Sequence, residues 1–294
     1  MEIISHEFTA MASPCRFLLI GDAKAVESAC IQAEQEVHRI EQKYSRYNSD
    51  SLLTQINKQA GKQAVEIDAE TAGLLNYAQQ CYEQSEGLFD ITSGILRKVW
   101  DFKSNKLPNQ AQLDHVLANI GWNLVEWDNQ QIFLSKPDME LDFGGFGKEY
   151  AADRAAEVFI NLGIQHGLVD LGGDIRIIGD KPDRSGWAIG IRNPNQPENA
   201  ISTLILHQGA MTTSGNYERF MMVNDKRYCH ILNPKTGWPI NHWASVTVLA
   251  SQCLVAGSLS TLAMLAEEEA QEWLQSQQIP FLAIDTQGNQ FSNQ

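Results

Sequence analysis

The sequence predicts an α+β (mixed α/β) protein, and three observations lead to that class. Apolar residues recur at helical spacing over long stretches of the first half, for example in residues 23–44. Short apolar and alternating segments dominate after residue 174. No linker, low-complexity tract or repeat of roughly 20 to 50 residues divides the chain. We therefore expect one domain over residues 1–294, in which mixed sheets pack against helices.

Helices are predicted where the helical spacing coincides with start and stop signals. The clearest spans residues 23–44, and Ser49 or Asp50 can cap a short helix over residues 51–58. Another helix over residues 67–86 has Asp68 as its cap and ends at Gly87. The remaining predicted helices cover residues 108–120, 253–266 and 267–277.

Strands are predicted where β-branched or alternating apolar residues lie between turn signals. A strand pair surrounds residues 10–14, and residues 122–134 form two strands joined at Asp128 and Asn129. Asn224 and Asp225 suit a hairpin turn. The other predicted strands cover residues 174–178, 187–192, 201–207, 209–214, 220–223, 227–232, 244–250, 281–284 and 290–291.

The stretch from Leu141 to Arg176 combines the most informative features. It reads as a short strand ending at Asp142, a glycine turn, a helix from about Lys148 and a strand over residues 167–171. Glycines between a strand and a helix let backbone approach a ligand, and a helix start offers N–H groups to an anion. A plain tight turn is the alternative. The glycine spacing matches neither a P-loop nor a dinucleotide-binding fingerprint.

Composition limits the classes of partner. The formal net charge of −14 argues against nucleic acid or an anionic membrane surface as the main partner, and a phosphate ligand would need local cations. No apolar run approaches the roughly 18 residues of a membrane span, and the N-terminus lacks the pattern of a signal peptide. The five cysteines are scattered and include no C-x-x-C pair. We expect a cytoplasmic protein with reduced thiols.

Seven ordered blocks of the chain resemble one known family. The blocks are residues 10–13, 45–47 with Asn57, 89–92, 142–153, 170–175, 213–219 and 230–237. Together they resemble the ApbE family of FAD:protein FMN transferases. The resemblance implies a T-fold-like domain that binds FAD and magnesium (Mg²⁺). It also implies the reaction, in which a Thr or Ser hydroxyl of an acceptor protein attacks the FMN phosphorus and AMP leaves.

The resemblance also assigns candidate residues, several of which have a structural alternative. Asp90 and Asp142 could each cap a helix, Tyr47 could be a turn aromatic, and Lys148 could be a solvated residue of a first turn. His230 could be a hydrogen-bonded structural group or a general base for the acceptor hydroxyl. The residues at family FAD-contact positions are Met11, Tyr47, Leu88, Phe89, Asp90, Asp142, Lys148 and His230.

The metal site departs from the family pattern. The resemblance implies a cation held by the carbonyl of Gly145 and by Thr261, with Ser260 as a further oxygen. Family members place an aspartate four residues before the threonine, where this chain has Gly257. Magnesium favours charged oxygen ligands, so the site should be weakened unless other oxygens replace the carboxylate. On sequence alone, Gly257→Asp is expected to tighten magnesium binding.

Three functions follow from these observations. The first is transfer of FMN from FAD to an acceptor protein. The second is an FAD-binding or carrier protein that has lost efficient metal-dependent transfer because of Gly257. The third is an FAD pyrophosphatase, which would use the same metal but water as the nucleophile.

Overall fold

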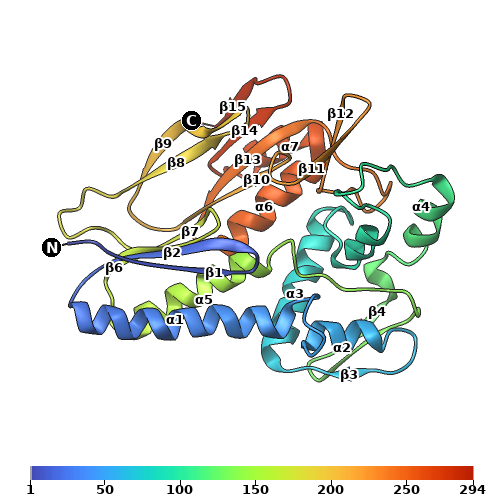
Figure 1. Ribbon diagram of the computed structural model, residues 1–294, viewed down its shortest axis with the longest axis horizontal. Helices are drawn as coiled ribbons and strands as arrows, with labels where there is room; N and C mark the ends of the chain where they lie inside the picture. Colours follow the sequence, from blue (N-terminus) through green and yellow to red (C-terminus); the bar gives the residue numbers. More distant parts are fainter. Residues whose placement is uncertain (1, 294) are drawn as a thin grey trace.

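A computed structural model describes residues 2–293, and its centre is an eight-stranded antiparallel sheet (Figure 1). The spatial order is β1-β2-β6-β7-β10-β13-β14-β15, and each neighbouring pair is antiparallel. The strands are β1 (Ile4–Ala10), β2 (Ser13–Ile20), β6 (His166–Leu171), β7 (Asp174–Gly179), β10 (Ala210–Gly215), β13 (Trp243–Ala250), β14 (Phe281–Asp285) and β15 (Gln290–Ser292).

Long helices cover one face of this sheet. They are α1 (Ala23–Tyr44), α5 (Gly147–Asn161) and α6 (Cys253–Ala266). Strand residues alternate between the two faces, so Phe17 and Val169 join the core cluster that contains the buried sides of α1 and α5. The predicted helices over residues 23–44 and 253–266 are confirmed with these bounds.

The opposite face is covered by a hairpin of β8 (Trp187–Asn193) and β9 (Gln196–Leu206). Trp187, Ile189 and Leu206 of this hairpin form a separate core cluster with Leu168 and Ile177 of the central sheet. The sheet is therefore buried on both faces, by helices on one and by a hairpin on the other.

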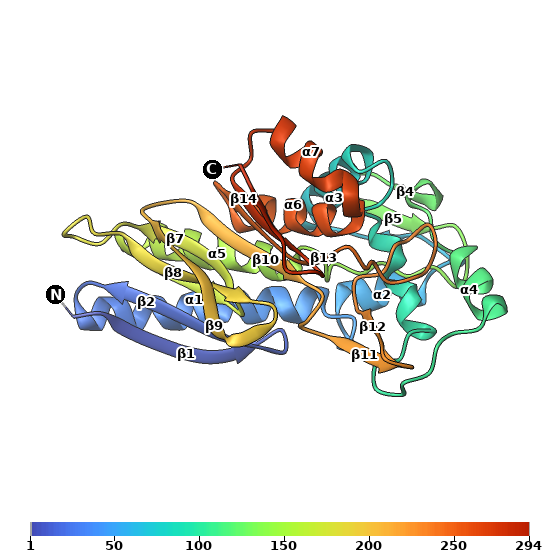
Figure 2. The ribbon, with the colours of Figure 1, turned by 90° about the horizontal axis from the view of Figure 1, so that it is seen from above.

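A mostly helical region lies at the end of the molecule opposite the N-terminus in both views (Figures 1 and 2). Its small sheet has the order β3-β5-β4. This region carries Leu88, Phe89 and Asp90 just before a 3₁₀ helix. Its elements are α2 (Leu52–Lys58), β3 (Val65–Glu66), α3 (Ala69–Gln84), η1 (Ile91–Lys98), α4 (Gln110–Leu117), η2 (Trp122–Leu124), β4 (Val125–Trp127) and β5 (Gln131–Leu134).

A second hairpin and two short helices complete the described chain. The hairpin of β11 (Phe220–Val223) and β12 (Lys226–Cys229) turns at Asn224 and Asp225, as predicted, and both residues have positive φ. After α6 come η3 (Glu267–Glu269) and α7 (Ala270–Ser276). The predicted single helix over residues 267–277 is thus divided into two.

Three details of the predicted elements are wrong. The expected mixed sheets are antiparallel in every described pairing. The segment ending at Asp142 is not a strand, because the amide side chain of Asn57, rather than a neighbouring strand, bonds both backbone groups of Leu141, at 2.7 and 3.0 Å. The cap of α2 is Ser51, because its hydroxyl accepts from Thr54 N at 3.0 Å.

The turn between β1 and β2 is made without glycine. Met11 and Ala12 have φ values of 51° and 58°, a left-handed conformation that costs a residue with a Cβ roughly 1–2 kcal/mol. Met11 N is also bound to the carboxylate of Glu41 at 2.7 Å, which fixes the turn against α1. A strained turn therefore presents the predicted FAD-contact residue Met11.

Ala12→Gly should raise the free energy of unfolding by up to about 1 kcal/mol, because glycine adopts positive φ without the Cβ clash. Ala25→Gly, on the exposed first turn of α1, should lower it by roughly 0.5–1 kcal/mol and serves as the control. Urea unfolding monitored by circular dichroism measures both. A loss of stability in Ala12→Gly would show that the turn is not strained in solution.

Candidate active site

The glycine turn leads directly into the first turn of α5, as predicted. Phe143 O accepts from Phe146 N at 3.1 Å and from Gly147 N at 2.7 Å, which closes the turn. Asp142 is fixed at the entry because its backbone N–H donates to Ile91 O at 2.9 Å. The carboxylate of Asp142 accepts from Gly144 N at 2.9 Å and so stabilises this turn. It does not cap the helix as the structural alternative required, because Phe146 precedes α5 and no side chain caps that helix.

The carboxylate of Asp142 also pairs with the guanidinium of Arg46 in the loop after α1. Arg46 in turn donates to the hydroxyl of Tyr47 at 2.9 Å, and its guanidinium lies 5.0 Å from the centroid of that ring. Hydrogen bonds from Arg46 and Arg219 lower the pKa of Tyr47. Tyr47 is 77% exposed, which leaves most of its surface free for a ligand.

His230 joins the same group of residues through Arg219. The β11–β12 hairpin places the two residues opposite each other, and Arg219 O accepts from His230 N at 2.9 Å. The ring Nδ1 of His230 is 3.0 Å from the same carbonyl oxygen. A carbonyl only accepts, so Nδ1 carries the hydrogen and Nε2 of the neutral ring is a free acceptor. Asp142, Tyr47 and His230, which are far apart in the chain, are thereby connected through Arg46 and Arg219.

Surrounding atoms lower the pKa of His230 below the ordinary histidine value of 6.5, although part of the side chain is exposed. Desolvation is the largest cause and the guanidinium of Arg219 adds to it, while the bond to Arg219 O and the carboxylate of Glu218 oppose it. The imidazole is therefore neutral at pH 7, which is the state that a general base requires.

Lys148 lies on the first turn of α5 and faces the turn between β6 and β7. Its Nζ is 3.0 Å from Oδ2 of Asp174 and 3.4 Å from Gly172 O. Burial lowers the pKa of Lys148, but the carboxylates of Asp174 and Glu149 outweigh burial and raise it overall. Lys148 is therefore a permanent cation, and not the fully solvated residue of the structural alternative.

Asp174, the buried partner of Lys148, lies where its charged form is disfavoured. Asp174 is 4% exposed, and burial raises the pKa of its carboxyl even though Lys148 acts in the opposite direction. The carboxylates of Asp170 and Glu218 also repel its charge and raise this pKa further. An additional anion near Lys148 must therefore compete with Asp174.

Met11 lies near this ion pair. The β1–β2 turn lies against the β6–β7 turn, where a Cβ on Gly172 would be 2.8 Å from Cβ of Ser13 and 3.4 Å from Nζ of Lys148. Gly172 has a φ of 62°. The strained turn at Met11 and the cation of Lys148 therefore border the same surface.

The segment Leu88-Phe89-Asp90 contributes mainly through Phe89. Phe89 is buried, and a Cβ on Gly145 would lie 3.1 Å from its Cζ, so the ring supports the glycine turn. Leu88 is half-buried and packs against the cluster that contains α6. These two residues therefore contribute packing contacts, Phe89 at the glycine turn and Leu88 near α6.

The carboxylate of Asp90 is occupied as a cap. It accepts from Thr92 N at 2.8 Å, from Thr92 Oγ1 at 2.6 Å and from Trp122 N at 3.1 Å. Asp90 is 7% exposed, and burial raises the pKa of its carboxyl while these bonds lower it. The predicted cap is confirmed, and contact with FAD through this carboxylate stays a prediction.

Three hydroxyl groups meet between α6 and β10. Oγ of Ser214 lies 2.8 Å from Oγ of Ser260 and 3.2 Å from Oγ1 of Thr261. Ser260 is fully buried and donates to Gly257 O at 3.0 Å, so it is less available to a cation than Thr261. Ser214 was not predicted as a site residue, although it stands in a family-like block beside the predicted Thr261.

Glu149 lies beside Gly257 and was also absent from the predicted site. A Cβ on Gly257 would be 2.4 Å from Cγ of Glu149 and 2.8 Å from its Oε1. Oε2 of Glu149 is buried and accepts no hydrogen bond within residues 2–293. Burial raises the pKa of the Glu149 carboxyl, and the carboxylate of Asp174 adds to this shift. No sequence signal assigned Glu149 a role, because its proximity to Gly257 depends on how α5 packs on α6.

Asp153, one helical turn after Glu149, has a structural role. Its two carboxylate oxygens accept from Cys253 N at 2.9 Å and from Leu254 N at 2.8 Å. These N–H groups belong to the first turn of α6, whose own preceding residue supplies no side-chain cap. Asp153 also pairs with Nε of Arg176 at 3.2 Å. It therefore fixes α6, and with it Gly257 and Thr261, against α5.

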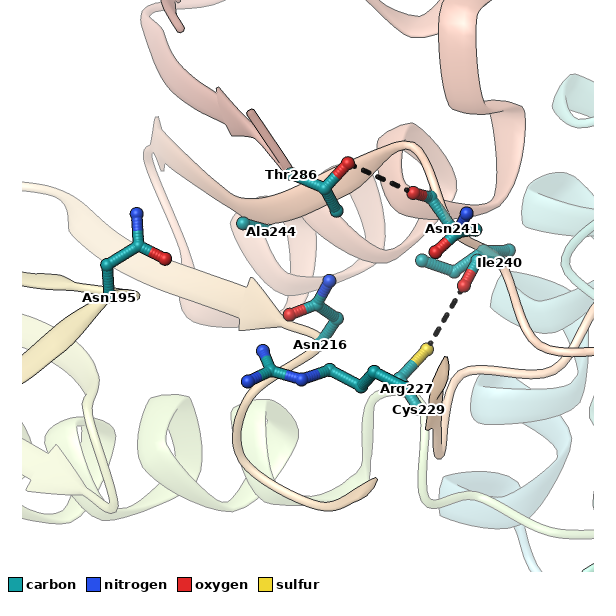
Figure 3. A pocket seen from close by; sticks show the side chains of 8 residues that line it. All are labelled: Asn195, Asn216, Arg227, Cys229, Ile240, Asn241, Ala244 and Thr286. Atoms are coloured by element: carbon teal, nitrogen blue, oxygen red, sulfur yellow. Dashed lines mark hydrogen bonds between the residues drawn. The ribbon is translucent and has the colours of Figure 1, made fainter. Parts of the chain in front are cut away.

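A cavity of about 260 Å³ lies beside the end of β12 (Figure 3). It is lined by Asn195, Asn216 and Arg227 among others, and by none of the predicted site residues. Cys229 lines it too and immediately precedes His230. The cavity therefore adjoins the site at the end of β12 and, through Asn216, at the end of β10.

The side chains and helices of the described residues limit the chemistry further. Residues 2–293 contain no group of three or more His, Cys, Asp or Glu side chains arranged to hold a metal ion. A cation would therefore need oxygen donors of other kinds. Over the same residues, no helix is both long enough and apolar enough to cross a membrane.

The fold and the site define a class: an α+β protein in which a glycine turn leads into a helix start beside a lysine, an arrangement whose N–H groups and positive charge suit an anion. The ApbE family model matches residues 11–283. This chain belongs to the ApbE family. Apart from Ala10, the blocks noted in the sequence fall within the matched residues, including those around Asp142 and His230.

Similar proteins agree with this assignment. The FAD:protein FMN transferase of Haemophilus influenzae is 34% identical over 243 residues, which cover 78% of this chain and 70% of the relative. The Escherichia coli K12 protein of the same name is 29% identical over 281 residues, covering 92% and 80%. The crystal structure of the ApbE protein of Thermotoga maritima superposes with a TM-score of 0.92 at 28% identity, covering 99% of this chain and 97% of that one. The flavin transferase ApbE of Vibrio cholerae gives 0.87 at 25% identity with the same coverage.

Proposed function

We propose that this chain is an FAD:protein FMN transferase that forms one domain over residues 1–294. The relatives of that name support the reaction class. The observation that carries the proposal is the series of contacts joining Asp142, Tyr47 and His230, three residues at family FAD-contact positions that come from separate segments. Lys148 and the start of α5 would face the diphosphate of FAD.

The proposed reaction exchanges the phosphoanhydride bond of FAD for a phosphoester bond to the acceptor. The hydroxyl oxygen of a Thr or Ser in the acceptor protein attacks the phosphorus on the FMN side of the diphosphate, and the bond from that phosphorus to the bridging oxygen breaks. AMP leaves with the bridging oxygen. Nε2 of His230 accepts the hydroxyl proton, because Nδ1 is already committed to Arg219 O.

Magnesium is part of the proposal. Thr261 and the carbonyl of Gly145 would hold the ion, with Ser260 and Ser214 nearby. The donor set fits a hard cation because every donor is oxygen, and within residues 2–293 Gly145 O accepts no hydrogen bond. When bound, the ion would offset the charge of the diphosphate in this acidic protein. Lys148 supplies the positive charge that belongs to the protein itself.

The two alternatives use the same site. An FAD carrier would keep the contacts to the flavin nucleotide without transfer, and an FAD pyrophosphatase would admit water in place of the acceptor hydroxyl.

The proposed cytoplasmic location rests on cysteine usage, and all five cysteines are free and buried.

Incubation of the purified chain with FAD, magnesium and a peptide carrying the family's threonine acceptor motif tests the proposal. We expect mass spectrometry to detect a peptide enlarged by FMN, and addition of EDTA to prevent this change. Release of AMP and FMN without peptide modification would favour hydrolysis. FAD binding with neither product would favour the carrier, and absence of FAD binding would exclude all three functions.

A further inference from the structure

We propose that Glu149 supplies, from α5, the carboxylate that is missing from α6 at Gly257, and that it binds the divalent cation of this site. The inference rests on the proposed function, because it names a ligand for the same cation. Glu149 would act together with Thr261, the carbonyl of Gly145 and the phosphates of bound FAD.

The first argument is that Glu149 occupies the space that an aspartate at position 257 would need. An aspartate at position 257 would project from its Cβ, and the Glu149 side chain already fills that position. Atoms Cγ, Oε1 and Cδ of Glu149 would lie 2.4, 2.8 and 2.9 Å from such a Cβ. Real Cβ atoms do not approach other heavy atoms that closely, so Glu149 and a side chain at position 257 exclude each other.

The second argument is that the carboxylate lies close to the other oxygen donors. Position 257 precedes Thr261 by four residues, and side chains at that spacing lie on the same face of a helix, one turn apart. Glu149 therefore lies about one turn from the hydroxyl of Thr261. It also follows Gly145 by only four residues, across the turn that opens α5.

The third argument is that part of this carboxylate is unsatisfied. Oε2 of Glu149 is buried and accepts no hydrogen bond from residues 2–293. A buried carboxylate oxygen without a partner is costly, and a divalent cation would remove that cost. Lys148 does not satisfy it, because the recorded ion pair of Lys148 is to Asp174.

The proposed donors suit magnesium in number and kind. Magnesium is usually held by one or two carboxylates together with substrate phosphates and water, rather than by a cage of protein ligands. One carboxylate, one hydroxyl and one carbonyl match that description. The site therefore needs no cluster of three acidic or histidine side chains, and residues 2–293 contain none arranged for a metal.

The geometry reverses the expectation for Gly257→Asp. That expectation assumed open space at position 257, but Glu149 occupies it. The single substitution should therefore displace Glu149 and place two acids in one buried space, and so should weaken cation binding rather than tighten it. The exchange Glu149→Gly with Gly257→Asp should restore binding, because it returns one carboxylate to the same space from the other helix.

The test measures binding of Mn²⁺, as a spectroscopic substitute for Mg²⁺, by electron paramagnetic resonance of the FAD-loaded protein. Glu149→Gln keeps the shape and removes the charge, and should weaken Mn²⁺ binding by at least about tenfold, since even residues behind metal ligands contribute 10- to 100-fold. Glu157→Gln, on an exposed part of the same helix, is the matched control and should leave Mn²⁺ affinity unchanged. FAD affinity without metal should stay within about twofold in both variants.

Gly257→Ala provides a second route if Glu149→Gln fails to fold. It adds only the Cβ that displaces Glu149, and should also weaken Mn²⁺ binding. Unchanged Mn²⁺ affinity in folded Glu149→Gln, or failure of the exchange to recover binding lost in Gly257→Asp, would overturn the inference. A wild-type protein that binds FAD but not Mn²⁺ would overturn it as well and leave FAD binding intact. Absence of FAD binding would instead indicate that the proposed function itself is wrong.

Discussion

His230→Gln should lower the rate of FMN transfer by roughly 10²- to 10⁴-fold, which is the usual contribution of a general base. Glutamine can still donate to Arg219 O, so the contact made by Nδ1 has a substitute. It has no basic nitrogen in place of Nε2. We therefore expect FAD affinity to change little while transfer to the acceptor peptide is nearly lost.

The control is His115→Gln on the exposed surface of α4, which should leave the transfer rate unchanged. Single-turnover measurement of FMN-peptide by mass spectrometry separates the chemical step from binding. A transfer rate in His230→Gln within a fewfold of wild type would exclude His230 as the base.

The pH dependence of transfer is a second outcome for the same residue. Desolvation and the guanidinium of Arg219 lower the pKa of His230, so its ring stays neutral to a lower pH than that of an ordinary histidine. Transfer should therefore fall as pH decreases through a midpoint below 6.5, the ordinary value for histidine. This fall in the transfer rate at low pH should be absent in His230→Gln. A midpoint above that value in the wild-type protein would contradict the proposed protonation state.

Lys148→Met should reduce both stability and FAD affinity. The substitution leaves the 4% exposed carboxylate of Asp174 without its cation, and breaking a buried pair in this way costs about 3 kcal/mol. FAD would also lose a charged contact, which corresponds to roughly tenfold or more in affinity. Urea unfolding and quenching of flavin fluorescence measure the two effects.

A double substitution separates the two roles of Lys148. Lys148→Met with Asp174→Asn removes both charges, so it should recover most of the lost stability. FAD affinity should remain low, because no cation faces the diphosphate. Recovery of FAD affinity in the double variant would show that Lys148 acts only as the partner of Asp174.

Local sequence patterns were sufficient to predict most elements. The bounds of α1 and α6 follow from helical spacing together with a cap or a preceding polar turn, which are properties of neighbouring residues. The hairpin turn at Asn224 and Asp225 and the cap by Asp90 were predictable for the same reason. The strand expected at Asp142 does not form. The backbone of Leu141 bonds to the side chain of Asn57, which is 84 residues away in the sequence, so local patterns could not reveal this contact.

The sequence by itself determined the family, the order of the elements and the residue types of the site, because these reside in local spacing and in ordered motifs. Only the tertiary structure decided which of those residues meet. Asp142 reaches His230 through Arg46 and Tyr47 of one segment and Arg219 of another. Likewise, the sequence revealed a missing carboxylate at Gly257, but only the packing of α5 on α6 placed Glu149 in that space. Contacts between distant segments depend on the shape of the whole core, which local patterns do not encode.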